Sequence, residues 1–327
     1  MHANPHPVQT MPPALSRWAC SARGVPYVHE RCGPQPGPEV LVTALVHGNE
    51  YSGAIVMDDL LACGWHPARG RVTLAFCNVA AFERFDKSQP DASRFIDEDF
   101  NRVWGLQRLD SRERSCELDR ARQLRALADR ATYLLDLHSM HEPGAPLLVT
   151  GTLQRNIDFA QALQTASQVV ADTGHADGVR LRDYGPFGQP GGPRIALLLE
   201  AGQHWQASAV TVARNTLMRF LVQAGATTRE AAPGGWLLPD KVPPEPLLVT
   251  HTVVATSMDF HFLPPFDTAI GGETIAQAGT VIALDAGREV LTPYNNCTLV
   301  MPSVRQLRPG VTTVRLGRQL APGLLQK

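Results

Sequence analysis

Two residues of the kind that bind zinc follow an apolar run near the start of the chain. In residues 43–56, which read TALVHGNEYSGAIV, His47 and Glu50 stand three positions apart in a turn that leaves a predicted buried strand. A histidine nitrogen and a carboxylate oxygen are two of the three protein ligands in a His₂Glu zinc site, whose fourth position is left for water. The pair alone is a weak indication, because His-x-x-Glu is common by chance.

A third ligand is available at the end of another predicted strand. His138 follows the apolar residues of LLDLHSM, and His141 lies three residues farther along and competes for the same role. Sites in α/β proteins lie beyond the carboxyl ends of the strands, so side chains at these ends can converge. The sequence therefore predicts a centre built from two histidines and one glutamate.

Glu200 is a single carboxylate that follows five apolar residues in IALLLEAGQ, again at the end of a predicted strand. Burying an unpaired carboxylate is costly, so such a glutamate generally has a partner or a catalytic task. Two interpretations stay open on the residues alone. Glu200 is either a proton acceptor for water at the metal or a salt-bridged structural residue.

The charged segment SRFIDEDFNRVWG adds four further candidates. The amide of Asn101 and the guanidinium of Arg102 suit a bidentate grip on a substrate carboxylate. Arg94 could polarise the oxygen of a scissile carbonyl, and Asp99 could orient a zinc-bound histidine. On its own, the segment is typical of a solvated loop.

The elements that must position these residues alternate between strand and helix. Strands are predicted over residues 25–33, 34–48, 70–82, 132–140 and 194–203, and helices over residues 51–64, 115–131, 156–174 and 206–225. This alternation predicts an α/β fold, with a mostly parallel mixed sheet covered by helices on both faces.

The pattern changes after about residue 226, where short β-like runs with many glycines and prolines show no helical period. This change predicts a small all-β domain. We therefore divide the chain into a Pro-rich, loosely ordered segment over 1–24, an α/β domain over 25–228 and a small β domain over 229–327.

Composition argues against several classes of partner. The chain has 30 basic and 31 acidic residues, a balance that provides no electrostatic case for nucleic acid or a membrane surface. No apolar stretch reaches the roughly 18 residues of a membrane span, and the N-terminus lacks the pattern of a signal peptide. The six cysteines form no CxxC pair, so we expect reduced thiols and a cytoplasmic location.

The order of these motifs resembles that of zinc carboxypeptidase-like proteins, and among them the succinylglutamate desuccinylase/aspartoacylase family. The matching motifs are HGNE at 47–50, EDFNR at 98–102, DLH at 136–138 and LLLEAG at 197–202. The late stretch GETIAQAG…REVLTPYNNCTLVMPS is similar to the small C-terminal β domain of this family. The resemblance thus extends over roughly residues 40–320.

The resemblance implies a role for each matching residue. One zinc ion per chain would be bound by His47, Glu50 and His138. Asp99 would support a histidine ligand, and Arg94 would stabilise the oxyanion. Glu200 would be the general base and later the acid in a hydrolysis by zinc-activated water.

In substrate binding the chain departs from the family pattern. Asn101 and Arg102 would hold a substrate carboxylate. Family members carry another substrate-binding arginine a little before the catalytic glutamate, and Arg194 is the candidate here, at a shorter spacing. They also place a tyrosine of the C-terminal domain in the site, whereas Tyr294 lies earlier in its domain. The sequence therefore does not indicate aspartate as part of the substrate.

The function that the resemblance implies is a zinc-dependent deacylase, which cleaves the amide bond of a small N-acylated amino acid or amine. A zinc carboxypeptidase for short peptides is one alternative, which the small β domain disfavours because it would narrow the cleft. The other is a non-catalytic metal-binding protein on the same scaffold, which the presence of all ligands and Glu200 disfavours. The expected partner is a small-molecule substrate, without nucleic acid or membrane, and a homo-oligomer stays open.

Overall fold

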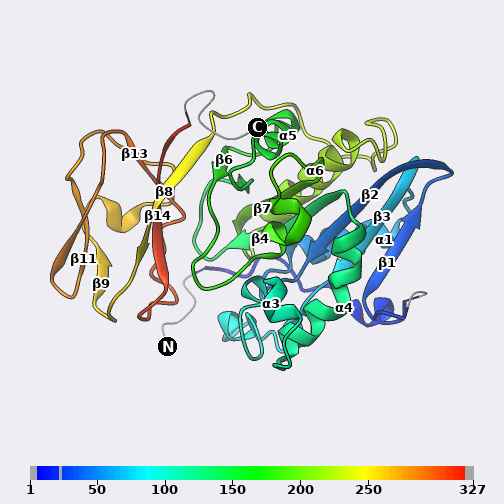
Figure 1. Ribbon diagram of the computed structural model, residues 1–327, viewed down its shortest axis with the longest axis horizontal. Helices are drawn as coiled ribbons and strands as arrows, with labels where there is room; N and C mark the ends of the chain where they lie inside the picture. The colour runs from blue at the N-terminus through cyan, green and yellow to red at the C-terminus, as the bar shows by residue number, and fades with distance from the viewer. Residues whose placement is uncertain (1–5, 22–23, 321–327) are drawn as a thin grey trace.

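The computed structural model describes residues 6–21 and 24–320, which are built around a large mixed sheet (Figure 1). From one edge to the other, its strands are β1 (Val28–Cys32), β3 (Arg69–Phe76), β2 (Gln35–Ala44), β4 (Tyr133–Met140), β7 (Ile195–Gln203), β5 (Leu147–Val149), β6 (Gln168–Ala171), β8 (Leu247–Val254), β14 (Thr312–Gln319), β13 (Cys297–Val300) and β10 (Thr274–Ile275). The middle of the sheet is parallel, because β2 pairs in parallel with β3 and β4, and β4 with β7. The predicted fold class is confirmed.

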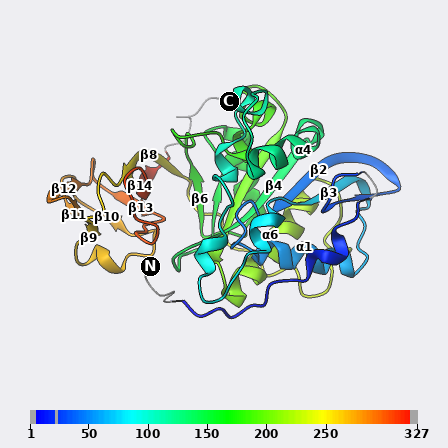
Figure 2. The same ribbon diagram turned by 90° about the horizontal axis from the view of Figure 1, so that it is seen from below.

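Helices cover both faces of the sheet. Alternate residues of β2 point to opposite sides, so that Val42 joins one hydrophobic core and Leu41 the other. The first core is closed by α1 (Ser52–Ala62), α5 (Gln154–Leu163) and α6 (Ala207–Gln223), and the second by α4 (Cys116–Arg130). Figure 2 shows α4 on one side of the sheet and α1 and α6 on the other.

Shorter helices lie in the connections between these elements. They are α2 (Val79–Phe82), α3 (Leu106–Leu109) and the 3-10 turns η1 (Leu15–Trp18), η2 (Pro90–Ser93), η3 (Phe100–Arg102), η4 (Leu181–Asp183), η5 (Gly185–Gly188) and η6 (Phe266–Thr268).

The helix predicted over 156–174 is wrong in its second half. Helix α5 ends where Gln164 adopts a left-handed conformation with φ of 53°. The chain then forms strand β6, in which Val169 and Val170 are buried. These β-branched residues pair with β5 and β8, and this long-range pairing outweighs the helix-like spacing of the preceding residues.

The C-terminal region forms a small β domain, which lies beside the larger part of the molecule (Figure 1). A three-stranded sheet of β9 (Phe260–Phe262), β11 (Val281–Asp285) and β12 (Arg288–Leu291) faces the end of the large sheet, and a separate hydrophobic core fills the domain. The domain is joined to the rest by parallel pairing of β6 with β8. Its first strand begins only at Leu247, and the preceding segment lies along α6, where Arg219 donates to the carbonyl oxygen of Leu238 at 2.6 Å.

The described part of the N-terminal segment differs from the expectation of loose order. Leu15 is buried in the core beside α1. The indole of Trp18 donates to the carboxylate of Asp58 on α1 at 2.6 Å. These contacts fasten residues 6–21 to the α/β domain, and residues 1–5 and 22–23 of the predicted loose segment lie outside the described residues.

Within residues 6–21 and 24–320, every helix is too short or too polar to span a lipid bilayer.

Candidate metal centre and active site

The turn that carries His47 and Glu50 connects β2 to α1 and is held tightly against the next loop. The amide of Glu50 donates to the carbonyl of His47 at 3.1 Å, and the amide of Gly48 donates to the carbonyl of Arg94 at 3.0 Å. A Cβ atom at position 48 would lie 2.4 Å from the carbonyl oxygen of Ser93, so the close approach requires glycine. The HGNE sequence therefore brings Arg94 to the turn.

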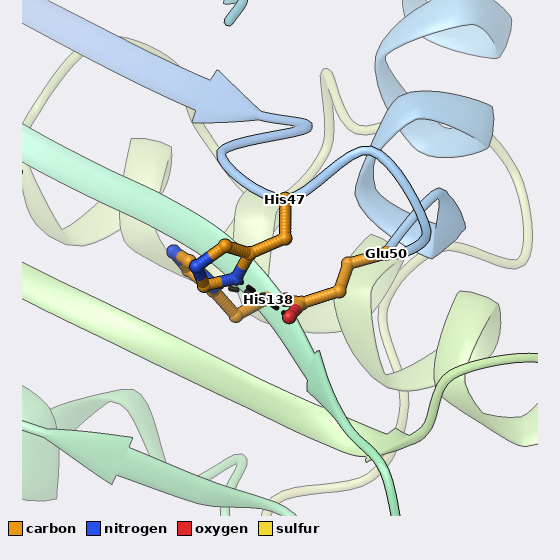
Figure 3. A group of neighbouring side chains, drawn as sticks. All are labelled: His47, Glu50 and His138. Atoms are coloured by element: carbon orange, nitrogen blue, oxygen red, sulfur yellow. Dashed lines mark hydrogen bonds and ion pairs between the residues drawn. The ribbon is translucent and has the colours of Figure 1, made fainter. Parts of the chain in front are cut away.

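His47, Glu50 and His138 converge on one point at the carboxyl ends of β2 and β4 (Figure 3). The Nδ1 atom of His47 lies 2.7 Å from Oε1 of Glu50, and Nδ1 of His138 lies 2.9 Å from Oε2. One ligand atom from each of the three buried side chains lies within 4.8 Å of the others. The structure thus brings together the three residues that the sequence proposed as ligands.

A carboxylate holds the outer nitrogen of each histidine. Nε2 of His47 lies 2.9 Å from Oδ1 of Asp99, and Nε2 of His138 lies 2.8 Å from Oδ2 of Asp136. Asp136 is itself fixed by the hydroxyl of Thr43, which donates to Oδ1 at 2.7 Å. Both Nδ1 atoms are consequently directed at the centre, as in metal-binding histidines supported by carboxylates.

The role of Asp136 was missed in the sequence, although the DLH motif contains it. Residues two apart on a strand lie on the same face, so this aspartate had to lie beside His138. That signal was available without the structure.

The charges around the centre favour a cation. Burial opposes the ionisation of Glu50, but His47 and His138 hold its pKa well below the usual range. Burial likewise opposes protonation of His138, but Asp136 and Glu50 raise its pKa well above the usual range. Carboxylates that draw a proton onto a buried imidazole are equally suited to a divalent cation. Two imidazole nitrogens and one carboxylate match the donor set of catalytic zinc.

Glu200 lies beside the centre on β7. It stands opposite His138 in the register of β4 and β7, and its side chain is buried. Its Oε2 atom has no hydrogen-bond partner among the described residues. Burial and the charge of Glu50 raise the pKa of Glu200 to about 8. A carboxyl group with such a pKa can both accept and donate a proton near neutral pH.

Arg94 reaches into the same centre. Its Nη1 donates to Oε1 of Glu50 at 3.1 Å, and its Nη2 lies 2.9 Å from Nε2 of His47 and 3.3 Å from Oδ2 of Asp99. A guanidinium in this position can face an oxygen that gains negative charge. Its role in stabilising an oxyanion stays a prediction.

Asn101 and Arg102, which were predicted to hold a substrate carboxylate together, make separate contacts in the structure. Oδ1 of Asn101 accepts from the amide of Leu181 at 2.9 Å, so one end of this side chain is used to fix the loop. Arg102 donates from Nε to Asp177 at 2.9 Å, and its Nη2 lies 3.2 Å from Nδ1 of His175. The guanidinium of Arg102 therefore lies within a second group of side chains.

His141, the competing third ligand, does not join the centre. Its Nδ1 lies 3.2 Å from Nε2 of His204, and its Nε2 lies 3.4 Å from Nη1 of Arg94. Among the described residues, the group of side chains suited to one metal contains His138 and not His141.

Arg194 and Tyr294 also lie away from the centre. Arg194 precedes β7, and its Nη1 donates to the carbonyl of Asp129, near the end of α4, at 2.7 Å. An extended strand separates it from Glu200 by roughly 20 Å, at about 3.3 Å per residue. The hydroxyl of Tyr294 lies 2.8 Å from that of Thr250 in the small β domain.

Arg315 and His175 approach the site without any signal in the sequence. Arg315 comes from β14, and its Nη2 lies 3.0 Å from Nε2 of His175. Its charge lowers the pKa of Glu200, although burial and Glu50 act more strongly in the opposite direction. Only the pairing of β6, β8 and β14 brings these residues together.

The site is thus a His–Glu–His centre at the carboxyl ends of the middle strands of a mixed sheet. Residues 36–185 match the family model described as the succinylglutamate desuccinylase/aspartoacylase catalytic domain. This part of the chain, which holds all three candidate ligands, is thus similar to that catalytic domain, as the motifs indicated. A comparison with curated proteins finds no match.

Several solved structures share the fold. A succinylglutamate desuccinylase from Vibrio parahaemolyticus superposes with a TM-score of 0.64 at 17% identity, over 90% of this chain and 87% of the other. A succinylglutamate desuccinylase/aspartoacylase from Rhodobacter sphaeroides has a TM-score of 0.63 at 18% identity, over 90% and 88%. The ectoine utilization protein EutE (DoeB) from Ruegeria pomeroyi has a TM-score of 0.61 at 18% identity, over 89% and 87%.

Proposed function

We propose that the protein is a zinc-dependent hydrolase that cleaves the amide bond of a small N-acylated amino acid or amine. The family match and the shared fold support deacylase chemistry. One observation carries the proposal: His47, Glu50 and His138 converge, with a carboxylate behind each histidine.

The three ligands would hold the ion through Nδ1 of His47, Nδ1 of His138 and the carboxylate of Glu50. Bound zinc supplies Lewis acidity toward a carbonyl oxygen and toward water. Asp99 and Asp136 keep the two imidazoles in the required orientation and tautomer, since each accepts from the outer nitrogen.

Glu200 acts as the general base. Its unpartnered Oε2 can accept a proton from the attacking water, and the same carboxyl group then donates that proton to the leaving nitrogen. The raised pKa of Glu200, caused by burial and by Glu50, makes it a stronger base than an exposed glutamate. Arg94 donates to the oxygen of the substrate carbonyl as negative charge develops there.

The first experiment separates metal binding from catalysis. Purified protein should contain about one zinc per chain, and chelation should remove metal and activity together. The variant Glu200→Gln should keep the metal and lose turnover, while Glu245→Gln, at an exposed position, serves as the matched control. Turnover that survives in Glu200→Gln contradicts the assigned base.

The second experiment identifies the substrate class. Zinc-loaded protein is assayed with N-acetyl, N-succinyl and N-formyl derivatives of amino acids and diamines, and with short peptides. Hydrolysis of the acylated compounds supports the proposal, and cleavage of the peptides alone indicates a carboxypeptidase. No hydrolysis at all, with zinc bound, indicates a non-catalytic protein.

We also propose that the protein works in the cytoplasm. All six cysteines are free thiols, and free thiols are typical of a reducing compartment.

A further inference from the structure

Two arginines from distant parts of the chain face a single histidine. Nη2 of Arg102 lies 3.2 Å from Nδ1 of His175, and Nη2 of Arg315 lies 3.0 Å from Nε2 of the same ring. Arg102 belongs to η3, His175 to the loop after β6, and Arg315 to β14 of the small β domain. The arrangement therefore joins three separate elements.

The imidazole cannot satisfy both arginines. A guanidinium only donates hydrogen bonds, and a neutral imidazole has one nitrogen that accepts and one that donates. One of the two contacts must consequently place an N–H group against another N–H group. Burial, Arg315 and Arg102 lower the pKa of His175 to about 2, so the ring stays neutral at ordinary pH.

Of the three arginines Arg102, Arg180 and Arg315, Arg315 is the one least neutralised by nearby carboxylates. Arg102 has Asp177 at 2.9 Å, and Arg180 has both oxygens of Asp172, the nearer at 2.6 Å. For the half-buried Arg315, the described residues provide no carboxylate within 4.0 Å, and His175 is the one side chain among them that lies within hydrogen-bonding distance. A half-buried cation without a counter-ion is costly, and it is a ready position for an anion.

His175 has room to leave the space between the arginines. It lines a cavity of about 410 Å³ together with Gly174 and Gly178. The base of its loop is closed by the ion pair between Asp172 and Arg180, which does not involve the imidazole. The ring can therefore turn away while the base of the loop stays in place.

The two arginines border the candidate metal centre. Nη1 of Arg102 lies 4.0 Å from Oδ2 of Asp99, the residue behind His47. Burial lowers the pKa of Arg315 while the charges of Asp172 and Glu200 raise it, so Arg315 lies within electrostatic range of the general base. A substrate held between the arginines can extend to the metal centre.

The family resemblance implies that Arg102 holds a substrate carboxylate. We propose that Arg315 completes a clamp with Arg102, in which this carboxylate takes the place of His175 between the two guanidinium groups. Two guanidinium groups on one carboxylate provide short, charge-assisted hydrogen bonds in place of the mismatched imidazole contacts. This assignment rests on the proposed function. A clamp of this kind favours N-acylated amino acids over N-acylated amines that lack a carboxylate.

Binding of simple carboxylates tests the clamp without any need for turnover. Zinc-loaded wild type, Arg315→Gln and Arg315→Lys are titrated calorimetrically with acetate, succinate and glutarate, and with the corresponding amides as neutral isosteres. Arg318→Gln is the matched control, because Arg318 lies on the same strand, is exposed and packs on Tyr294. A carboxylate held only by zinc would be bound equally by all four proteins.

We expect at least one carboxylate to bind wild type more tightly than its amide does. Arg315→Gln should weaken that carboxylate at least tenfold and leave the amide unchanged, Arg315→Lys should be intermediate, and Arg318→Gln should match wild type. Equal carboxylate binding in wild type and Arg315→Gln overturns the clamp. The clamp is also overturned if wild type binds none of the three carboxylates more tightly than the corresponding amide.

The variant His175→Ala separates displacement from a structural role. If the carboxylate replaces the imidazole, removal of the ring should leave affinity unchanged or raise it several-fold. Loss of affinity in this variant, with thermal stability retained, shows that His175 holds the ligand and contradicts displacement.

Kinetics on N-acyl amino acids and their carboxamides distinguish this inference from the proposed function. Arg315→Gln should raise KM at least tenfold more for the acids than for the carboxamides. Because the charge of Arg315 also lowers the pKa of Glu200, its loss should change kcat by the same factor for both kinds of compound. Clamp binding without hydrolysis of any compound would sink the proposed function and leave the clamp. If Arg315→Gln hydrolyses both kinds of compound and its KM changes by the same factor for acids and carboxamides, the clamp is contradicted and the proposed function stands.

Discussion

The candidate metal centre and the clamp of Arg102 and Arg315 differ in the sign of their uncompensated charge. In the metal centre, two imidazoles are surrounded by the carboxylates of Glu50, Asp99 and Asp136. In the clamp, two guanidinium groups share one neutral imidazole. The first region is prepared for a cation and the second for an anion. Burial and Glu50 raise the pKa of Glu200, and Arg315 lowers it, so both regions act on the same carboxyl group.

The two regions also differ in where their residues come from. All residues of the metal centre lie within the α/β domain: His47 and Glu50 follow β2, Asp136 and His138 belong to β4, and Asp99 directly precedes η3. The clamp needs one residue from each domain. Metal binding should therefore respond to changes inside the α/β domain, and carboxylate binding to changes in either domain.

The change with the largest expected effect removes a ligand. His138→Ala should abolish stoichiometric zinc binding and reduce hydrolysis by about 1,000-fold or more, since the catalytic ion is lost. Zinc content and turnover are measured side by side. His261→Ala, at an exposed position of the small β domain, is the control, and normal zinc content in His138→Ala would refute the ligand set.

A smaller effect is expected from the residue behind His138. Asp136→Asn keeps the size of the side chain but weakens its hold on the imidazole, so zinc affinity should fall by about 10–100-fold. Competition with a chelator of known affinity measures the change. An unchanged affinity would mean that Asp136 does not orient the ligand.

The stability of chelator-treated protein should depend on pH through the protonation of Glu200. Its pKa is raised from 4.5 to about 8 by burial and by Glu50, so the folded state holds this proton more tightly than the unfolded state. The resulting stability is complete below pH 4.5 and is lost as the pH rises toward about 8. Glu200→Gln should accordingly be more stable than wild type at pH 9, by up to about 5 kcal/mol, because the pKa rises from 4.5 to about 8 and each pKa unit corresponds to 1.36 kcal/mol.

Urea unfolding of both proteins at pH 5 and pH 9 measures this difference. The gain in Glu200→Gln should be small at pH 5 and larger at pH 9. A constant difference at the two values would show that the carboxyl group does not titrate in this range.

The smallest effect is expected at the contact between the domains beside Arg94. Arg305 donates from Nε to Asp91 at 2.7 Å, and Arg94 follows the short helix η2 that contains Asp91. Arg305→Gln should lower kcat several-fold while zinc content stays normal, because the loop that carries Arg94 loses an anchor. A double-mutant cycle with Asp91→Asn checks the cause: additive losses would contradict coupling through the ion pair.

The residues of the metal centre could be predicted because they depend on local rules. Strand ends at one edge of a parallel sheet place His47, Glu50 and His138 near one another, and the two-residue period of β4 adds Asp136. Those rules hold wherever a strand is correctly assigned.

Arg102 was predicted to hold a substrate carboxylate, but the approach of Arg315 and His175 to it could not be predicted, because it depends on pairing between distant strands. β6 was hidden within a predicted helix, and without β6 there is no path that brings β8 and β14 to the site. Arg194 is a different case, because the strand predicted over 194–203 already places it at the amino end of that strand, away from Glu200 near the carboxyl end. Whether a short segment forms a strand depends more on its pairing with adjacent strands than on its own sequence.

The parallel pairing of β6 with β8 has a consequence for attempts to shorten the protein. A chain cut before Leu247 would leave β6 as a bare edge, with unpaired backbone groups open to association with other chains. It would also discard Arg315. The α/β domain carries every candidate metal ligand. As an isolated fragment, however, it should tend to aggregate, and it should bind acids no more tightly than their neutral amides.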